Sequence, residues 1–210
     1  MAKSTVYRLL LAVAGGFLSS LAYPREGIWP MIFIAVAALL LSVRGLGFRQ
    51  AFGMGYLGGF LFYVSQIEWM SLYLGPVPLL ALSALEAFFF GLGMAAISLV
   101  WQKLEAKPKL RLRNASIALA IAIIWTAREW VSTNLPYGGF PWSRLAMSQS
   151  ESPLANWVYF GGQPLLTLVI VFVSTLVTLW LLQARIQGWR NRGTVFTGAI
   201  VAVAFLLPAL

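Results

Sequence analysis

Apolar segments long enough to cross a lipid bilayer recur along this 210-residue chain. A helix of about 20 mostly apolar residues spans the roughly 30 Å hydrocarbon layer. The composition agrees, since 60% of residues are hydrophobic and only 10% are charged. The sequence therefore predicts an all-α, polytopic membrane helix bundle, with residues 1–210 forming one transmembrane domain. The seven expected spans are Val6–Tyr23, Ile28–Val43, Ala51–Trp69, Pro78–Trp101, Ala115–Ser132, Leu165–Leu182 and Val195–Leu210.

The basic residues predict the direction of these spans. With a cytoplasmic N-terminus, twelve of the 15 basic residues fall on the cytoplasmic side: Lys3, Arg8, Arg44, Arg49, Lys103, Lys107, Lys109, Arg111, Arg113, Arg185, Arg190 and Arg192. Only Arg25, Arg128 and Arg144 fall on or near the outer side. This asymmetry follows the positive-inside rule and places the C-terminus outside. We therefore interpret the net charge of +9 as a topology signal, and expect no nucleic-acid partner.

The first apolar segment also fits a secretory signal peptide. Lys3 and Arg8 precede the apolar run, and Ser20-Leu21-Ala22 matches a cleavage site. An uncleaved first helix keeps the alternation of charge regular, and we prefer that interpretation.

Most catalytic side chains are absent from the sequence. It contains no Cys and no His, and all six acidic residues are Glu. A thiolate nucleophile, a Ser-His-Asp triad and Cys or His metal ligands are therefore excluded within these residues. We expect no metal and no cofactor.

Three Glu residues fall within the expected spans, where ionisable groups are costly and indicate function. Glu68 and Glu129 lie near the outer ends of their spans, and Glu86 lies deeper. Arg25, Arg128 and Arg144 lie at the same level and could pair with them. Two alternatives stay open: Glu68 and Glu129 could simply be interfacial, or the three carboxylates could form the relay of a small ion- or proton-coupled transporter.

The longest expected outer segment, residues 133–164, is rich in Gly, Pro, Trp and Tyr. Such a composition fits neither a plain helix nor a polar linker. We expect an interfacial or re-entrant structure that shapes a lipid-facing cleft. An aromatic belt on a long loop and the binding surface of a non-catalytic scaffold are the alternatives.

Gly55 and Gly59 form a small-xxx-small pair within the third span. This spacing predicts close packing of that helix against a neighbour.

Several short motifs recur in an order that resembles the membrane part of bacterial apolipoprotein N-acyltransferases. They are Leu21-Ala22-Tyr23-Pro24, Trp29-Pro30, the Gly-rich start of the third span, Glu68-Trp69, Glu129-Trp130, Gly139-Phe140-Pro141-Trp142, Ser148-Gln149, Ser152-Pro153-Leu154 and Gly161-Gly162. Each motif is weak alone, but together they cover essentially the whole chain.

The resemblance implies a multi-pass enzyme of the bacterial cytoplasmic membrane that transfers an acyl chain from a phospholipid to the N-terminal diacylglyceryl-Cys of lipoproteins. In that family, a nitrilase-like outer domain supplies a Cys nucleophile, a Glu base and a Lys. The expected partners are thus a phospholipid acyl donor, a lipoprotein acceptor and a separate nitrilase-like catalytic chain.

The absence of Cys departs from the family pattern, so no catalytic residue can be transferred to this sequence. We expect the chain alone to be inactive, whether it is a fragment, a split enzyme or a degenerate relative. Its expected role is membrane anchoring and lipid access. The residues predicted to form the lipid cleft or docking surface are Glu129, Trp130, Phe140, Pro141, Trp142 and Gln149.

Overall fold

Each of the first six apolar segments coincides with a helix. The computed structural model describes residues 2–107, 112–187, 195 and 198–199. Its helices are α1 (Ala2–Ser20), α2 (Met31–Val43), α3 (Phe48–Gln66), α4 (Met70–Leu74), α5 (Pro76–Glu105), α6 (Arg113–Ser132) and α7 (Val158–Gln187), with 3₁₀ helices η1 (Leu145–Gln149) and η2 (Pro153–Trp157). The predicted class, an all-α membrane helix bundle, is confirmed.

The helices differ in how well they match a bilayer. Within the described part of the chain, three are long and apolar enough to cross one: Pro76–Glu105, Arg113–Ser132 and Pro153–Arg185. The apolar helix α2 has only 13 residues, which corresponds to about 20 Å. The backbone of α7 leaves the helical conformation at Gly161 and Gly162, so its first turn is set at an angle to the rest.

Part of the predicted topology falls outside the described residues. Most of the expected seventh span, Val195–Leu210, lies there, and so do Lys109, Arg111, Arg190 and Arg192.

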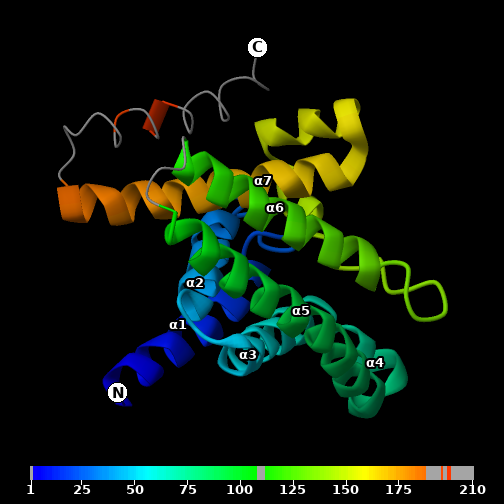
Figure 1. The fold of residues 1–210 in the computed structure, drawn as a ribbon. Coiled ribbons are helices and arrows are strands. Elements are labelled where there is room, and N and C mark those ends of the chain that lie inside the picture. The colour runs from blue at the N-terminus through cyan, green and yellow to red at the C-terminus, as the bar shows by residue number, and fades with distance from the viewer. Residues whose placement is uncertain (1, 108–111, 188–194, 196–197, 200–210) are drawn as a thin grey trace.

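Contacts between connecting segments define two opposite ends of the bundle. At the first, which we call the loop end, the Tyr23 hydroxyl donates to the Ser143 carbonyl at 3.0 Å. At the second, the basic end, Arg8 donates to the Arg44 carbonyl at 2.7 Å, and Arg44 forms an ion pair with Glu105 at 2.8 Å. Successive long helices therefore run in alternating directions. Figure 1 shows α3 against α5, α5 against α6 and α6 against α7.

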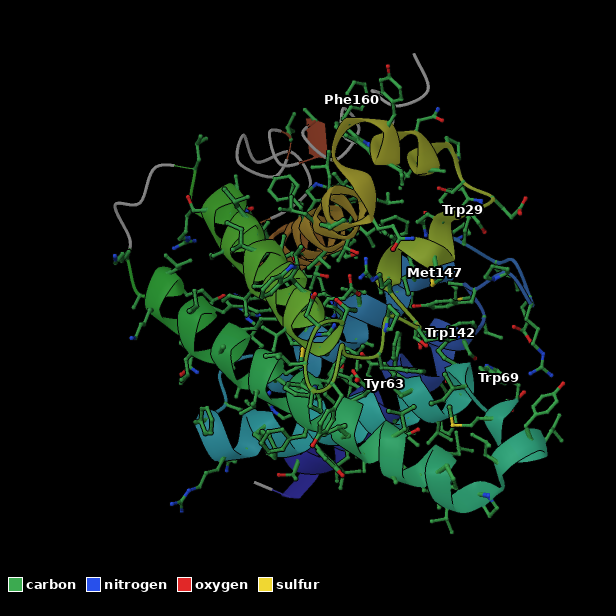
Figure 2. The ribbon with its side chains drawn as sticks, turned by 90° about the vertical axis from the view of Figure 1, so that its right-hand side faces the viewer. Trp29, Tyr63, Trp69, Trp142, Met147 and Phe160 are labelled. Carbon is green, nitrogen blue, oxygen red and sulfur yellow. The ribbon has the colours of Figure 1, made fainter. Side chains whose placement is uncertain are left out.

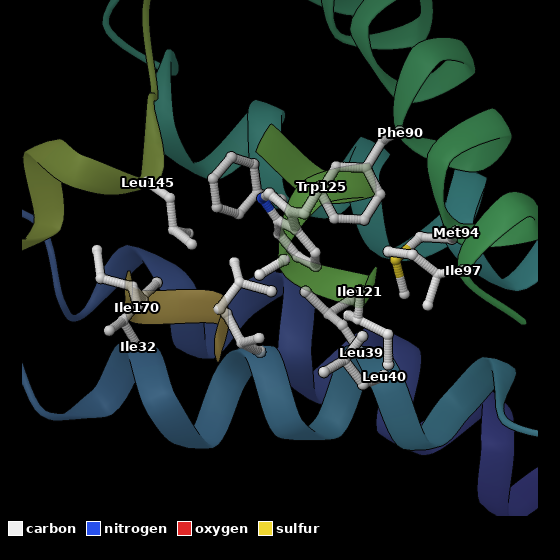
Figure 3. Close-up of a cluster of buried hydrophobic side chains, with 14 of the residues drawn as sticks. Ile32, Leu39, Leu40, Phe90, Met94, Ile97, Ile121, Trp125, Leu145 and Ile170 are labelled. Carbon is white, nitrogen blue, oxygen red and sulfur yellow. The ribbon is translucent and has the colours of Figure 1, made fainter. Parts of the chain in front are cut away.

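The core joins helices that are distant in the sequence (Figure 3). Phe90 of α5 and Trp125 of α6 meet edge to face, with ring centroids 5.2 Å apart. Leu39 of α2 and Ile170 of α7 belong to the same buried cluster. Leu145 of η1 also belongs to it, so the irregular segment after α6 is anchored in the core.

Glycines allow α3 to approach its neighbours closely. A Cβ atom on Gly59 would lie 2.6 Å from the Phe90 Cβ of α5, and one on Gly55 would lie 2.5 Å from the Met94 Cβ. Atoms that close must move apart, so α3 and α5 require both glycines at this spacing. The close packing predicted from the small-xxx-small pair is confirmed.

We expect Gly55→Ala and Gly59→Ala each to destabilise the bundle by about 1–3 kcal/mol, the usual cost of overpacking. Gly53→Ala is the matched control, because a Cβ there meets no atom within 4 Å. Thermal unfolding in detergent measures the effect. Equal melting temperatures for all three variants would contradict the close contact of α3 with α5.

Candidate functional site at the loop end

A cavity of about 1120 Å³ opens at the loop end of the bundle. Its walls come from the end of α1 and the following turn, from the end of α3 with α4, and from residues 142–147. The lining includes Phe17, Ser20, Tyr23, Arg25, Glu26, Gln66, Glu68, Trp69, Leu72, Trp142, Ser143 and Met147. Segments that are far apart in the sequence thus combine in one cavity with both charged and aromatic walls.

Three charged side chains meet at this cavity. Arg25 forms ion pairs with Glu68 and, at 3.3 Å, with Glu26. The Arg25 side chain is 72% exposed and that of Glu68 is 55% exposed, so solvent screening keeps the stabilisation by this pair small. The Arg25–Glu68 bridge links the α1–α2 turn to the connection between α3 and α4, and it is easily opened. One expected pairing of an outer Arg with a span Glu is therefore present.

An aromatic pair lies beside these charges. The rings of Trp69 and Trp142 are 5.6 Å apart and tilted by 52°. Figure 2 shows both rings on the same side of the molecule as Met147, which also lines the cavity. Trp side chains favour the headgroup level of a bilayer because they combine an apolar ring with a polar N–H.

Glu129 joins three elements rather than facing the large cavity. One carboxylate oxygen accepts the Leu145 backbone N–H at 2.9 Å, and the other accepts the Thr167 hydroxyl at 2.7 Å. The residue is only 7% exposed. The Glu129 carboxylate therefore fixes η1 against α6 and α7.

Three hydrogen bonds attach the cavity wall to the α1–α2 turn. The Tyr23 hydroxyl is shared between the carbonyls of Ser143 and Arg144, at 3.0 and 3.2 Å. The buried Gln149 amide donates to the Trp29 carbonyl at 3.3 Å. Residues 143–149 are thus held from both sides, which positions the wall that contains Ser143 and Met147.

Glu86 belongs to a separate polar cluster inside the bundle. It is 1% exposed and interacts electrostatically with Arg128. The Arg128 guanidinium donates to the Tyr63 hydroxyl at 3.1 Å. It also lies 4.6 Å from the Phe90 ring centroid and 5.3 Å from that of Trp125. Arg128 itself is partly buried. The carboxylate, the hydroxyl and the two aromatic faces around it offset part of the free-energy cost of removing its charge from water.

The remaining predicted site residues lie apart from one another. Trp130 is 63% exposed on α6, and Phe140 packs against the small apolar cluster of Ile67, Met70 and Leu79. Pro141 is exposed next to Trp142. Of the predicted residues, Glu68 and Trp142 therefore meet at the large cavity, while Glu129 and Trp130 line a second, smaller one.

Sequence reasoning did not single out Tyr23 or Arg25 as site residues. Tyr23 belongs to the Leu21-Ala22-Tyr23-Pro24 motif, and Arg25 is an outer basic residue expected at the level of the span Glu residues. The signal for both is the position of polar side chains at and just beyond the outer end of the first expected span, Val6–Tyr23, where a side chain can reach across to other outer segments.

The sequence was then compared with known proteins. Residues 15–176 match the family described as the apolipoprotein N-acyltransferase N-terminal domain. That range includes every described residue of the site.

Individual relatives agree with the family match. An apolipoprotein N-acyltransferase of Pseudomonas putida is 33% identical over 178 residues, which cover 80% of this chain and 34% of the relative. The corresponding protein of Vibrio vulnificus is 35% identical over 182 residues, covering 81% and 35%. That of Pseudomonas syringae pv. tomato is 31% identical over 192 residues, covering 84% and 35%. The chain thus spans about a third of the length of these curated relatives.

The geometry around Glu129 predicts different outcomes for two substitutions. In Glu129→Gln, the amide oxygen can accept from Leu145 and the amide nitrogen can donate to the Thr167 hydroxyl, so stability should stay close to that of the original protein. Glu129→Leu leaves both donors unpaired, and we expect it to cost about 1–3 kcal/mol for each. Thermal unfolding in detergent measures both variants.

Glu151→Leu, at an exposed position on the same segment, is the control. A Gln variant as unstable as the Leu variant would contradict the positioning role, because it would show that the negative charge itself is required.

Proposed function

Because the chain belongs to the apolipoprotein N-acyltransferase N-terminal domain family, we propose that it is the membrane part of such an enzyme. The reaction would transfer an acyl chain from a phospholipid to the N-terminal diacylglyceryl-Cys of a lipoprotein. This chain would supply membrane anchoring and lipid access. The observation that carries the proposal is the large cavity at the loop end, within the matched range.

The cavity has the size and polarity that a lipid substrate needs. Its volume of about 1120 Å³ exceeds the usual range of small-molecule sites. Apolar side chains such as Phe17 and Leu72 line it together with the ion-paired Arg25 and Glu68. A phospholipid combines acyl chains with a charged headgroup, so each part would find a matching surface.

The predicted cleft residues would then have two roles. Trp142 and Glu68, which line the cavity, would contact lipid directly, while Trp130, Phe140 and Pro141 would form nearby docking surface. Glu129 and Gln149 would act as positioning residues, since both hold η1 in place. Binding contacts remote from the reacting ester can still accelerate a reaction by orienting it.

We propose that the protein crosses the bacterial cytoplasmic membrane several times, with the basic end in the cytoplasm. Arg8, Arg44 and Lys103 belong to that end, whereas Arg25 and Arg144 belong to the loop end. The positive-inside rule then directs the cavity to the outer side. A lipoprotein acceptor would meet the lipid there.

The nucleophile would come from outside these 210 residues, which contain no Cys. A nitrilase-like catalytic partner with a Cys, a Glu and a Lys would dock at the loop end, next to the cavity. Acyl transfer through a thioester requires that thiolate.

Reconstitution tests whether this chain supplies lipid access while a separate partner supplies the nucleophile. In liposomes with an acyl-labelled phospholipid and a diacylglyceryl-Cys peptide, we expect no transfer by this chain alone. Addition of the remaining two thirds of the Pseudomonas putida relative should restore it. Acyl transfer by this chain alone would overturn the proposal that the nucleophile comes from a partner.

Lipid capture tests the cavity itself. A phospholipid with a photoreactive acyl chain should label the protein, and Trp142→Ala should lower the yield several-fold by removing one wall. Phe160→Ala is the matched control, because this exposed ring lies away from the cavity (Figure 2). Equal capture by the two variants would contradict lipid binding at the cavity.

A further inference from the structure

A second, much smaller cavity lies where α6, α7 and the segment before η1 meet. It has a volume of about 20 Å³, and one water molecule needs about 10–15 Å³ on this measure. The residues that line it are Thr126, Glu129, Trp130, Thr133, Arg144 and Pro164. The space therefore accommodates a single water-sized molecule among polar side chains.

Two buried polar atoms beside this space have no hydrogen-bond partner among the described residues. They are the Arg144 Nε and the Thr126 Oγ1. A buried donor without a partner costs about 1–3 kcal/mol. Each Glu129 oxygen accepts one hydrogen bond, from Leu145 or Thr167, and a carboxylate can accept up to about four. Donors and spare acceptor capacity therefore surround the same space.

The charges around the space select its occupant. Among the described residues, the ion pairs within 4.0 Å do not include one between Glu129 and Arg144, although both line the cavity. A cation in the gap would be repelled by Arg144, and an anion would be repelled by Glu129. A neutral molecule that both donates and accepts hydrogen bonds satisfies both sides.

We propose that this cavity is a specific site for one ordered water molecule. The water accepts a hydrogen bond from Arg144 Nε, donates one to the Glu129 carboxylate and pairs with the Thr126 hydroxyl. It thereby connects α6 to the residue that precedes η1. The inference goes beyond the proposed function and does not depend on the lipid or the reaction.

Substitution of Thr126 distinguishes a bound water from an unpaired hydroxyl, because the two cases predict opposite changes in melting temperature. Thr126→Val keeps the shape of the side chain but removes the hydroxyl. If the water is bound, the variant loses a hydrogen bond and its melting temperature in detergent falls by about 2–4 °C. If Thr126 Oγ1 is truly unpaired, removing it is neutral or stabilising, and that result overturns the proposal.

Two further variants make the test specific. Thr126→Ser keeps the hydroxyl and should restore most of the stability that Thr126→Val loses. Ser83→Ala is the matched control, because the Ser83 hydroxyl is also buried without a described partner but lines neither cavity. Its removal should be neutral or stabilising.

A density map of the full chain in nanodiscs at about 2 Å would show the water directly. We expect one peak within hydrogen-bond distance of Arg144 Nε, Glu129 and Thr126 Oγ1. A direct contact between the Arg144 guanidinium and Glu129, with no peak between them, would overturn the proposal.

Discussion

The hydrocarbon layer supplies no water to pair with backbone N–H and C=O groups, and the rest of this structure depends on that constraint. Helices satisfy it locally. The irregular segment after α6 pairs some of its backbone groups within its own turns, such as the Gly139 N–H with the Pro136 carbonyl, and side chains of other elements pair with others. The Glu129 carboxylate accepts the Leu145 N–H, and the Tyr23 hydroxyl donates to two carbonyls of the same segment. These buried groups permit a non-helical wall beside the large cavity.

Close helix packing complements this polar pairing. Gly55 and Gly59 bring α3 against α5, and Gly93 of α5 leaves room for the side chain of Arg128, since a Cβ there would lie 2.7 Å from the Arg128 Cγ. Arg128 can therefore pass over α5 and reach the Tyr63 hydroxyl on α3. Small residues thus determine both the spacing of the helices and the position of the partly buried Arg128 charge.

The helices and their alternating directions could be predicted from the sequence. The apolar runs give the length of each span, and the basic residues show which end of it faces the cytoplasm. The partners of Glu129 could not, because the face of α6 that it occupies depends on how α7 and η1 pack. The level of Arg25 could be predicted too, but the choice of Glu68 as its partner could not, since the ion pair joins positions 43 residues apart. The Glu129-Trp130 motif identified the correct region, but it combines a buried positioning residue with an exposed ring.

The distribution of the three Glu side chains argues against a relay of carboxylates. Glu68 is exposed at the large cavity and paired with Arg25, Glu129 lines the small cavity with both oxygens engaged, and Glu86 lines neither. Proton or ion transfer along carboxylates requires a continuous path between them. Here each carboxylate has its own cationic or hydrogen-bonding partners on different helices. Such separate pairing instead stabilises the helices around a cavity at one end of the bundle, which agrees with the proposed role in lipid access.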